Sequence, residues 1–404
     1  GISDYSAELI PHLLKYYDVE LITADDRSND LDLGCPIRSV EWFRTQHAKF
    51  DRVLYHIGNS EFHQHIFPLL ATIPGVVVLH DFFLSSIMAQ MDATGVAPGC
   101  WSEALYYSHG YTAVDEMAKA KDQSDIIWRY PANLRTLQDA DGVIVHSDFA
   151  RRLADEWYGA GAGDDWTVIP LLRNPIDCAQ ALRAAAREDL GIAVDEFVVA
   201  SFGMVGPTKL NDRLVDAFEA STLADNKLTR LILVGENNSG QYGLELDQRL
   251  AAGNGRYRCT GRVDATTYRN YLLASDVAVQ LRATSRGETS AAILDCMNAG
   301  VALIANANGS QADLHSDSVL LLPDDFTLAE LATALESLWE NPHERARLAG
   351  AARQVVQRNH EPANCAARYY DAIERYAEQP FSRAQLQRAI AWHPLAATSR
   401  HDIP

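Results

Sequence analysis

The sequence predicts an α/β protein with two domains, each built around a parallel sheet that helices cover. Continuous apolar runs alternate with amphipathic segments of helical periodicity along most of the chain, which is typical of parallel strands buried on both faces. The length of 404 residues fits two domains of ordinary size. An apolar content of 47% is sufficient for two large cores.

The first part of the chain begins with a predicted helix at residues 4–16 and continues as alternating strands and helices. The expected strands are 19–23, 52–57, 76–79 and an apolar run within 140–150, and the expected helices between them are 41–50 and 61–71. A Rossmann-type domain normally begins with a strand, but none precedes the first helix. We therefore expect that the native N-terminus lies upstream of Gly1 or that the sequence belongs to a larger polypeptide.

The second part of the chain repeats this alternation after a predicted hinge at residues 171–177. The expected strands lie at the start of 197–212 and at 230–235, 277–281 and 301–305, and the expected helices are 268–274, 291–299, 327–340, 342–359 and 361–377. These elements predict an N-terminal domain at 1–173, a C-terminal domain at 174–360, and a helix and tail at 361–404 that pack on the N-terminal domain.

Charge and composition limit the partners of the protein. The formal net charge is −19, so the chain lacks the basic surface that nucleic acid requires and leaves room only for weak peripheral association with a membrane. No apolar run of about 18 residues and no signal peptide are visible in the sequence. The six cysteines form no C-x-x-C pair, which predicts free thiols in a cytoplasmic protein.

The stretch at residues 282–300 carries the clearest signal for a ligand site. It predicts a strand end, a tight turn and then a helix whose first backbone N–H groups, those of Thr289, Ser290 and Ala291, have no partner within the helix. The N–H groups and the dipole at the start of a helix both favour an anion such as phosphate. We therefore expect a diphosphate site here.

Charged side chains flank this expected site. Arg282 and Arg286 would supply positive charge to a diphosphate. Glu288 and Asp295 are seven residues apart, which is two turns of a helix, so both carboxylates are expected on one helical face. Carboxylates on both sides of a diphosphate suit the hydroxyl groups of a nucleotide sugar. A βαβ unit with a surface glutamate and a capped helix is the alternative.

The stretch resembles the signature loop and helix of glycosyltransferase family 4, which comprises retaining enzymes of the GT-B fold. Asp295 aligns with the second glutamate of the family's E-x₇-E motif, whereas Glu288 lies one residue short of the first, so the spacing here is E-x₆-D. Residues 140–150, 167–170, 197–212 and 274–280 resemble further family segments in the same order. The resemblance implies two Rossmann-like domains with parallel sheets facing a central cleft, and a C-terminal helix that crosses back to the N-terminal domain.

The resemblance implies that the C-terminal domain binds a GDP- or UDP-linked sugar. Lys209 matches the lysine of the family's glycine-rich loop, but Met204 occupies the position of its arginine, so Arg282 or Arg286 would supply the missing charge. The donor-binding residues implied in this way are Lys209, Arg282, Arg286, Thr289, Ser290, Asp295, Arg262 and Val263.

The expected catalytic residues are His80 and Glu288. His80 follows the apolar strand 76–79 and resembles the family's histidine near the reacting sugar, although a hydrogen-bonded loop histidine is the alternative. Glu288 would bind hydroxyl groups of the donor sugar, and Asp295 those of the ribose. The candidates on the acceptor side are Gly1, Asn59, His63 and Asp81.

The expected reaction moves a sugar, for which the resemblance favours mannose, from a nucleoside diphosphate to a glycan or lipid-linked acceptor with retention at the anomeric carbon. Such a reaction would serve surface polysaccharide or glycoconjugate biosynthesis. No cofactor and no metal are expected, and the isolated pair Asp30 and Asp32 is expected in a solvated loop. Two other functions remain open, namely a GT-B-fold nucleotide-sugar epimerase and a non-catalytic GT-B module of a larger polysaccharide-synthesising protein.

Overall fold

The computed structural model describes residues 1–24, 33–253 and 255–378, which form two compact units. Within these residues, unit 1 consists of Gly1–Leu172, the short segment Arg286–Thr289 and Pro362–Glu378, and unit 2 consists of Arg173–Ser285 and Ser290–Glu361. The main divisions lie one residue from the predicted ones, whereas the segment Arg286–Thr289 was expected in the C-terminal domain. The predicted packing of the tail beyond residue 378, and the pair Asp30 and Asp32, lie outside the described residues.

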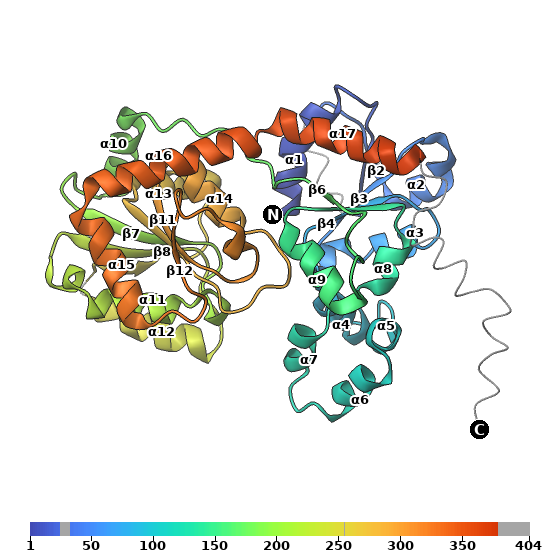
Figure 1. The fold of residues 1–404 in the computed structure, drawn as a ribbon, viewed down its shortest axis with the longest axis horizontal. Helices are drawn as coiled ribbons and strands as arrows, with labels where there is room; N and C mark the ends of the chain where they lie inside the picture. The colour runs from blue at the N-terminus through green and yellow to red at the C-terminus, as the bar shows by residue number, and fades with distance from the viewer. Residues whose placement is uncertain (25–32, 254, 379–404) are drawn as a thin grey trace. The chain divides into compact units, whose positions relative to one another are not determined.

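Unit 1 contains a parallel sheet in the order β3-β4-β5-β6 and a separate parallel pair of β1 and β2. The strands are β1 (Leu21–Thr23), β2 (Ile37–Ser39), β3 (Leu54–Ile57), β4 (Val76–Leu79), β5 (Gly142–Val145) and β6 (Thr167–Val168). The helices are α1 (Ile2–Leu13), α2 (Val40–Gln46), α3 (Ile66–Leu70), α4 (Ser85–Ala93), α5 (Cys100–His109), α6 (Tyr111–Lys119), α7 (Gln123–Arg129), α8 (Leu134–Asp139), α9 (Asp148–Tyr158) and α17 (Pro362–Glu378). Every residue of β4 and β5 is buried, because α1 and α17 cover one face of the sheet and α3, α8 and α9 the other (Figure 1).

Two predicted helices of unit 1 are shorter than expected. The range 61–71 divides into a 3₁₀ turn, Glu61–His63, and helix α3. Pro68 explains the break, because proline lacks an N–H group and fits only the first turn of a helix, whereas a helix over the whole range would place it in the interior. The range 41–50 is helix α2 followed by a 3₁₀ turn, His47–Lys49, which is a common way for a helix to end.

The final helix α17 belongs to unit 1, as the predicted crossover to the N-terminal domain requires. Its Tyr369 hydroxyl lies 2.7 Å from the hydroxyl of Tyr5 on α1, and both side chains are buried. Its Tyr376 hydroxyl donates to the carbonyl oxygen of Val143 in β5 at 2.8 Å. A Cβ atom added to Gly142 would lie 2.2 Å from the Tyr376 ring, so glycine is needed where the helix meets the sheet.

Unit 2 contains a parallel sheet in the order β12-β11-β10-β7-β8-β9. Its strands are β7 (Phe197–Phe202), β8 (Thr229–Val234), β9 (Tyr257–Cys259), β10 (Val277–Gln280), β11 (Ala302–Asn306) and β12 (Leu320–Leu322). Its helices are α10 (Gln180–Asp189), α11 (Asn211–Ala220), α12 (Gln241–Ala251), α13 (Ala265–Ala274), α14 (Ala291–Asn298), α15 (Leu328–Glu340) and α16 (Pro342–Asn359). Helices α10, α13 and α14 lie on one side of this sheet, and α11 and α12 lie on the other (Figure 1). The six residues of β7 are all buried, as the apolar sequence predicts.

Three further observations concern membranes, metals and thiols. None of the helices within the described ranges is long and apolar enough to cross a membrane. Among the described residues, no three His, Cys, Asp or Glu side chains form a group that could hold a metal ion. All six cysteines are free thiols, and Cys296 and Cys365 are buried.

Candidate functional site

The strand order of unit 2 selects the two loops that follow β7 and β10. The chain runs outward from β7 to β8 and β9 and then returns to place β10 on the other side of β7. In doubly wound sheets, ligands bind at the carboxyl edge where the order reverses in this way. The two loops are joined, because the Ala283 N–H donates to the carbonyl oxygen of Thr208 at 3.0 Å.

The loop after β7 is built around glycine and carries Lys209. A Cβ atom on Gly235 would lie 2.0 Å from the carbonyl oxygen of Gly203, whose φ is 102°, so both positions require glycine. Lys209 closes a 3₁₀ turn, and Leu210 then adopts a left-handed conformation with φ 50° before α11 begins. Lys209 therefore lies in a separate turn ahead of this helix.

The loop after β10 begins with a buried arginine beside a cavity of about 410 Å³. The backbone N–H of Arg282 donates to Oδ1 of Asn306 and its carbonyl oxygen accepts from Nδ2 of the same residue, both at 2.8 Å. These bonds fix Arg282 at the carboxyl edge of the sheet. The cavity is lined by two arginines, two aspartates and two apolar residues, namely Leu210, Arg213, Arg282, Ala283, Asp324 and Asp325.

Helix α14 begins at Ala291, with Ser290 as its N-cap residue and no side-chain capping hydrogen bond. The hydroxyl group of Thr289 is buried without a partner. Because the first N–H groups of a helix have no acceptor within it, this uncapped end keeps the donors that an anion would need. Glu288 lies ahead of the helix, so the prediction that it shares a helical face with Asp295 is wrong.

The segment Arg286–Thr289 packs within unit 1. The carbonyl oxygen of Arg286 accepts hydrogen bonds from the N–H groups of Phe82 at 2.9 Å and Phe83 at 3.0 Å. The Arg286 guanidinium lies 4.5 Å from the centre of the Trp128 ring, which is a cation–π contact. Its N–H donates to Oε2 of Glu288 at 2.6 Å, so one oxygen of that carboxylate faces its own loop. The arginine thus has an aromatic partner and a structural role in the loop.

Asp295 on α14 is held from two sides within unit 2. Its Oδ1 atom lies 2.8 Å from Nε of Arg173, and both side chains of this ion pair are mostly buried. Its Oδ2 atom accepts a hydrogen bond of 3.2 Å from the Tyr268 hydroxyl. Burial, followed by the neighbouring carboxylate, raises the pKa of Tyr268, so this phenol remains a donor. The carboxylate of Asp295 is therefore fixed in orientation.

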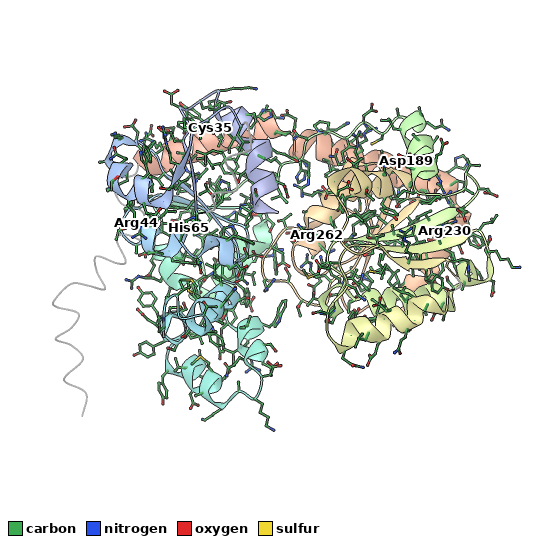
Figure 2. All side chains as sticks on the ribbon, turned by 180° about the vertical axis from the view of Figure 1, so that it is seen from behind. Cys35, Arg44, His65, Asp189, Arg230 and Arg262 are labelled. Carbon is green, nitrogen blue, oxygen red and sulfur yellow. The ribbon has the colours of Figure 1, made fainter. Side chains whose placement is uncertain are left out.

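Arg262 and Val263 follow β9 at the edge of the unit 2 sheet. Arg262 is exposed, and Figure 2 shows it at the carboxyl end of the sheet, with Arg230 at the opposite end. Arg230 has a structural partner, because it forms an ion pair of 2.6 Å with Glu196. Of these two arginines, only Arg262 lies at the edge that the strand order selects.

Three histidines meet at the carboxyl edge of the unit 1 sheet. His80 follows β4 and contacts a histidine from each neighbouring strand. Its Nε2 atom lies 3.1 Å from Nδ1 of His56, and its Nδ1 atom lies 3.2 Å from Nε2 of His146. The Nδ1 atom of His146 lies 2.9 Å from the carbonyl oxygen of Ile169. Both ring nitrogens of His80 therefore have partners inside the protein.

Aromatic rings cover this group of histidines. The Tyr5 ring lies edge-on to the His80 ring, with centroids 5.1 Å apart, and its hydroxyl contacts that of Tyr369. Burial, followed by the nearby His146, lowers the pKa of His56 to about 3. The same causes lower the pKa of His80 from its ordinary value. Both rings are thus neutral at physiological pH.

The acceptor-side candidates lie beside this group. The N–H of Asn59 donates to Oδ2 of Asp81 at 2.9 Å, and the side-chain nitrogen of Asn59 is buried without a partner. A Cβ atom on Gly58 would lie 3.3 Å from both Oδ2 of Asp81 and Cε1 of His63, so these two side chains are neighbours. Gly1 is exposed, and its amino group pairs with a residue of its own helix.

The residues that the sequence analysis missed are His56, His146, Arg173 and Tyr268. The register of the parallel strands offered a signal for the histidines. His56 pairs with Val78, two residues before His80, and Val78 pairs with Ile144, two residues before His146. Because side chains alternate along a strand, all three histidines project from one face of the sheet.

Residues 183–355 match the sequence model of a family described as glycosyl transferases group 1. A search among curated proteins finds no match. The chain is similar to the structure of sucrose-phosphate synthase from Thermosynechococcus elongatus, with 20% identity and a TM-score of 0.66 over 93% of each chain. It is also similar to Anabaena Alr3699/HepE in complex with UDP-glucose, with 17% identity and a TM-score of 0.63 over 91% of this chain and 96% of that chain. At such identities the likeness shows the fold, and the predicted GT-B class with two Rossmann-like units is confirmed.

Proposed function

We propose that the protein is a retaining glycosyltransferase that moves a sugar from a nucleoside-diphosphate sugar to a glycan or lipid-linked acceptor. The observation that carries the proposal is the reversal of strand order in unit 2, because the Lys209 loop and the loop leading to the uncapped start of α14 follow the two strands at that reversal. The match of residues 183–355 to the group 1 glycosyl transferases supports this class of reaction. Surface polysaccharide or glycoconjugate biosynthesis is the corresponding role.

In this proposal, unit 2 binds the nucleotide. The diphosphate would accept hydrogen bonds from the first N–H groups of α14 and would interact with the charges of Lys209 and Arg282. The ribose hydroxyls would donate to Asp295. An ionised carboxylate offers about four acceptor positions, and Arg173 and Tyr268 occupy two of those on Asp295, so others remain for ribose. The backbone around Arg262 and Val263 would border the base.

The proposed reaction is attack on the same face as the leaving group. The bond between the anomeric carbon and the β-phosphate oxygen breaks, and the acceptor oxygen bonds to the anomeric carbon. The acceptor proton passes to the departing phosphate oxygen, whose charge the N–H groups of α14 and the nearby cations would stabilise. Glu288 would accept hydrogen bonds from hydroxyls of the donor sugar. The proposal includes no metal and no cofactor.

The first test is binding of nucleotides, measured by thermal unfolding with UDP, GDP, UDP-glucose and GDP-mannose. The complexes of Alr3699/HepE suggest the uridine ligands, and the family resemblance suggests mannose. A ligand at about 100 times its Kd stabilises a protein by about 2.7 kcal/mol, and a tenfold weaker ligand by about 1.4 kcal/mol. We expect Lys209→Gln to reduce the stabilisation to about half in this way, whereas Lys227→Gln, at an exposed lysine, keeps it in full.

The second test is turnover with the donor that binds. Transfer to an acceptor with retention supports the proposal, and Glu288→Gln and Asp295→Asn should both lower the rate while the protein stays folded. Release of an epimerised nucleotide sugar from donor alone would replace the proposal with an epimerase. If no nucleoside diphosphate stabilises the protein, the proposal is refuted in favour of a non-catalytic module.

A further inference from the structure

The histidine chain of unit 1 has a proton order that is set from one end when the His146 ring is neutral. A carbonyl oxygen can only accept, so the Ile169 oxygen requires that His146 carry its proton on Nδ1. In a neutral ring, Nε2 of His146 is then an acceptor, and Nδ1 of His80 must donate to it across 3.2 Å. Nε2 of His80 must in turn accept from Nδ1 of His56 across 3.1 Å.

This order disfavours an extra proton on His80. A proton added to Nε2 of His80 would face the Nδ1–H of His56, so two donors would share one contact. A proton added to Nε2 of His146 would face the Nδ1–H of His80 in the same way. The three buried rings are therefore linked by hydrogen bonds. Adding a proton to His80 would break one of these bonds.

We propose that His56 and His146 are positioning residues that hold His80 as a neutral imidazole, protonated on Nδ1 and with both ring nitrogens occupied. This inference rests on the proposed function, together with the family resemblance, which implies that His80 lies near the reacting sugar. It changes the role expected of His80 from the sequence, because a ring with two occupied nitrogens is neither an acid nor a hydrogen-bond donor to the substrate. What it offers is a fixed and uncharged ring edge.

An uncharged ring suits the proposed transfer. The anomeric carbon gains positive charge as its bond to phosphate breaks, and an imidazolium beside it would raise the energy of that state. The rings of Tyr5 and Tyr369 cover the histidines and exclude the water that could stabilise a charged ring. In the proposed reaction, three neutral rings would add no positive charge near an anomeric carbon that becomes positive itself.

The test uses nitrogen-15 NMR of labelled histidine side chains at pH 7, which distinguishes protonated from unprotonated ring nitrogens. A His80→Gln variant assigns the His80 signals. Two matched variants then probe the ends of the chain. An asparagine side-chain nitrogen can take the place of a histidine Nδ1 but does not reach the position of Nε2. His56→Asn therefore keeps the donor to His80, whereas His146→Asn removes its acceptor.

We expect His80 in the wild-type protein to be protonated on Nδ1 alone, and His56→Asn to leave this pattern unchanged. In His146→Asn, a second population protonated on Nε2 should appear. With the donor found above, kcat should fall by at least about tenfold in His146→Asn with little change in the donor KM, because a His80 ring that has lost one of its two partners no longer presents a fixed edge in the reaction step. In His56→Asn, kcat should stay within about threefold of the wild-type value.

Wild-type His80 protonated on Nε2, or on both nitrogens at pH 7, would overturn the inference, and the wild-type spectrum decides this even where a variant fails to fold. An unchanged His80 pattern in His146→Asn would overturn it as well. The two proposals fail separately. Absence of nucleotide binding removes the proposed function but leaves the measured proton order, whereas transfer by a protein with the wrong His80 tautomer removes only this inference.

Discussion

Acidification from pH 7 to pH 5 should weaken unit 1, because buried neutral histidines must gain protons when it unfolds. Burial and His146 lower the pKa of His56 from 6.5 to about 3 in the folded protein. Between these two values the unfolded chain binds a proton that the folded protein does not. The stability that His56 contributes is therefore complete above pH 6.5 and is lost as the pH falls from 6.5 towards 3. Each pH unit in this range corresponds to about 1.4 kcal/mol, so the loss at pH 5 is about 2 kcal/mol from His56 alone.

The measurement is urea unfolding at pH 7 and pH 5, followed by tryptophan fluorescence. Fluorescence reports mainly on unit 1, because that unit holds most of the tryptophans in the described residues, namely Trp42, Trp101, Trp128, Trp157 and Trp166, against Trp339 in unit 2. The variant His56→Asn keeps the donor to His80 but has no group that titrates. It should reduce the pH-dependent loss by about 2 kcal/mol. The control His47→Gln removes an exposed histidine and should leave the loss unchanged. A His56→Asn protein that loses as much stability as the parent would refute the reasoning.

Three further predictions concern packing and the ion pair of unit 2. Gly142→Ala should destabilise unit 1 by about 1–3 kcal/mol in the same urea assay, because its Cβ would lie 2.2 Å from the Tyr376 ring. Gly350→Ala in α16 should instead stabilise the protein by about 0.5–1 kcal/mol, since nothing lies within 4 Å of the added Cβ and alanine favours the helix; a lower melting temperature would contradict this. Asp295→Ala should cost about 2 kcal/mol by leaving the Arg173 charge unpaired, and Arg173→Met in the same chain should restore at least half of that loss. A double variant no more stable than Asp295→Ala would contradict the last prediction.

Much of the fold could be predicted because its signals are local. The run 76–79 is strand β4 at its predicted bounds, since a continuous apolar run is what a doubly covered strand requires. The helix predicted at 342–359 matches α16 at both ends. An asparagine N-cap and Pro342 in the first turn mark its start. The loops around Lys209 and Ser290 could be predicted as well, because each motif is contiguous in the sequence and follows a strand.

The partners of the site residues could not be predicted in the same way. Asp295 is paired with Arg173, which is 122 residues away, and His80 contacts a histidine 66 residues away. Neither pairing leaves a local pattern, because both depend on which strands and helices become neighbours. The strand order supplies that information, and the register of β3, β4 and β5 then brings the three histidines together.

The position of Glu288 shows why the spacing between two motif residues has to be combined with the bounds of the helix. The prediction placed Glu288 and Asp295 on one helix. On a helix, a spacing that is shorter by one residue would rotate a side chain by about 100°. The helix begins only at Ala291, and the backbone of Arg286 is fixed by Phe82 and Phe83 instead. The shorter spacing is therefore a difference in loop length, which leaves α14 and the Arg173–Asp295 pair unaffected. The shorter loop affects only the direction in which it holds the Glu288 carboxylate. One oxygen of this carboxylate accepts a hydrogen bond from the Arg286 N–H.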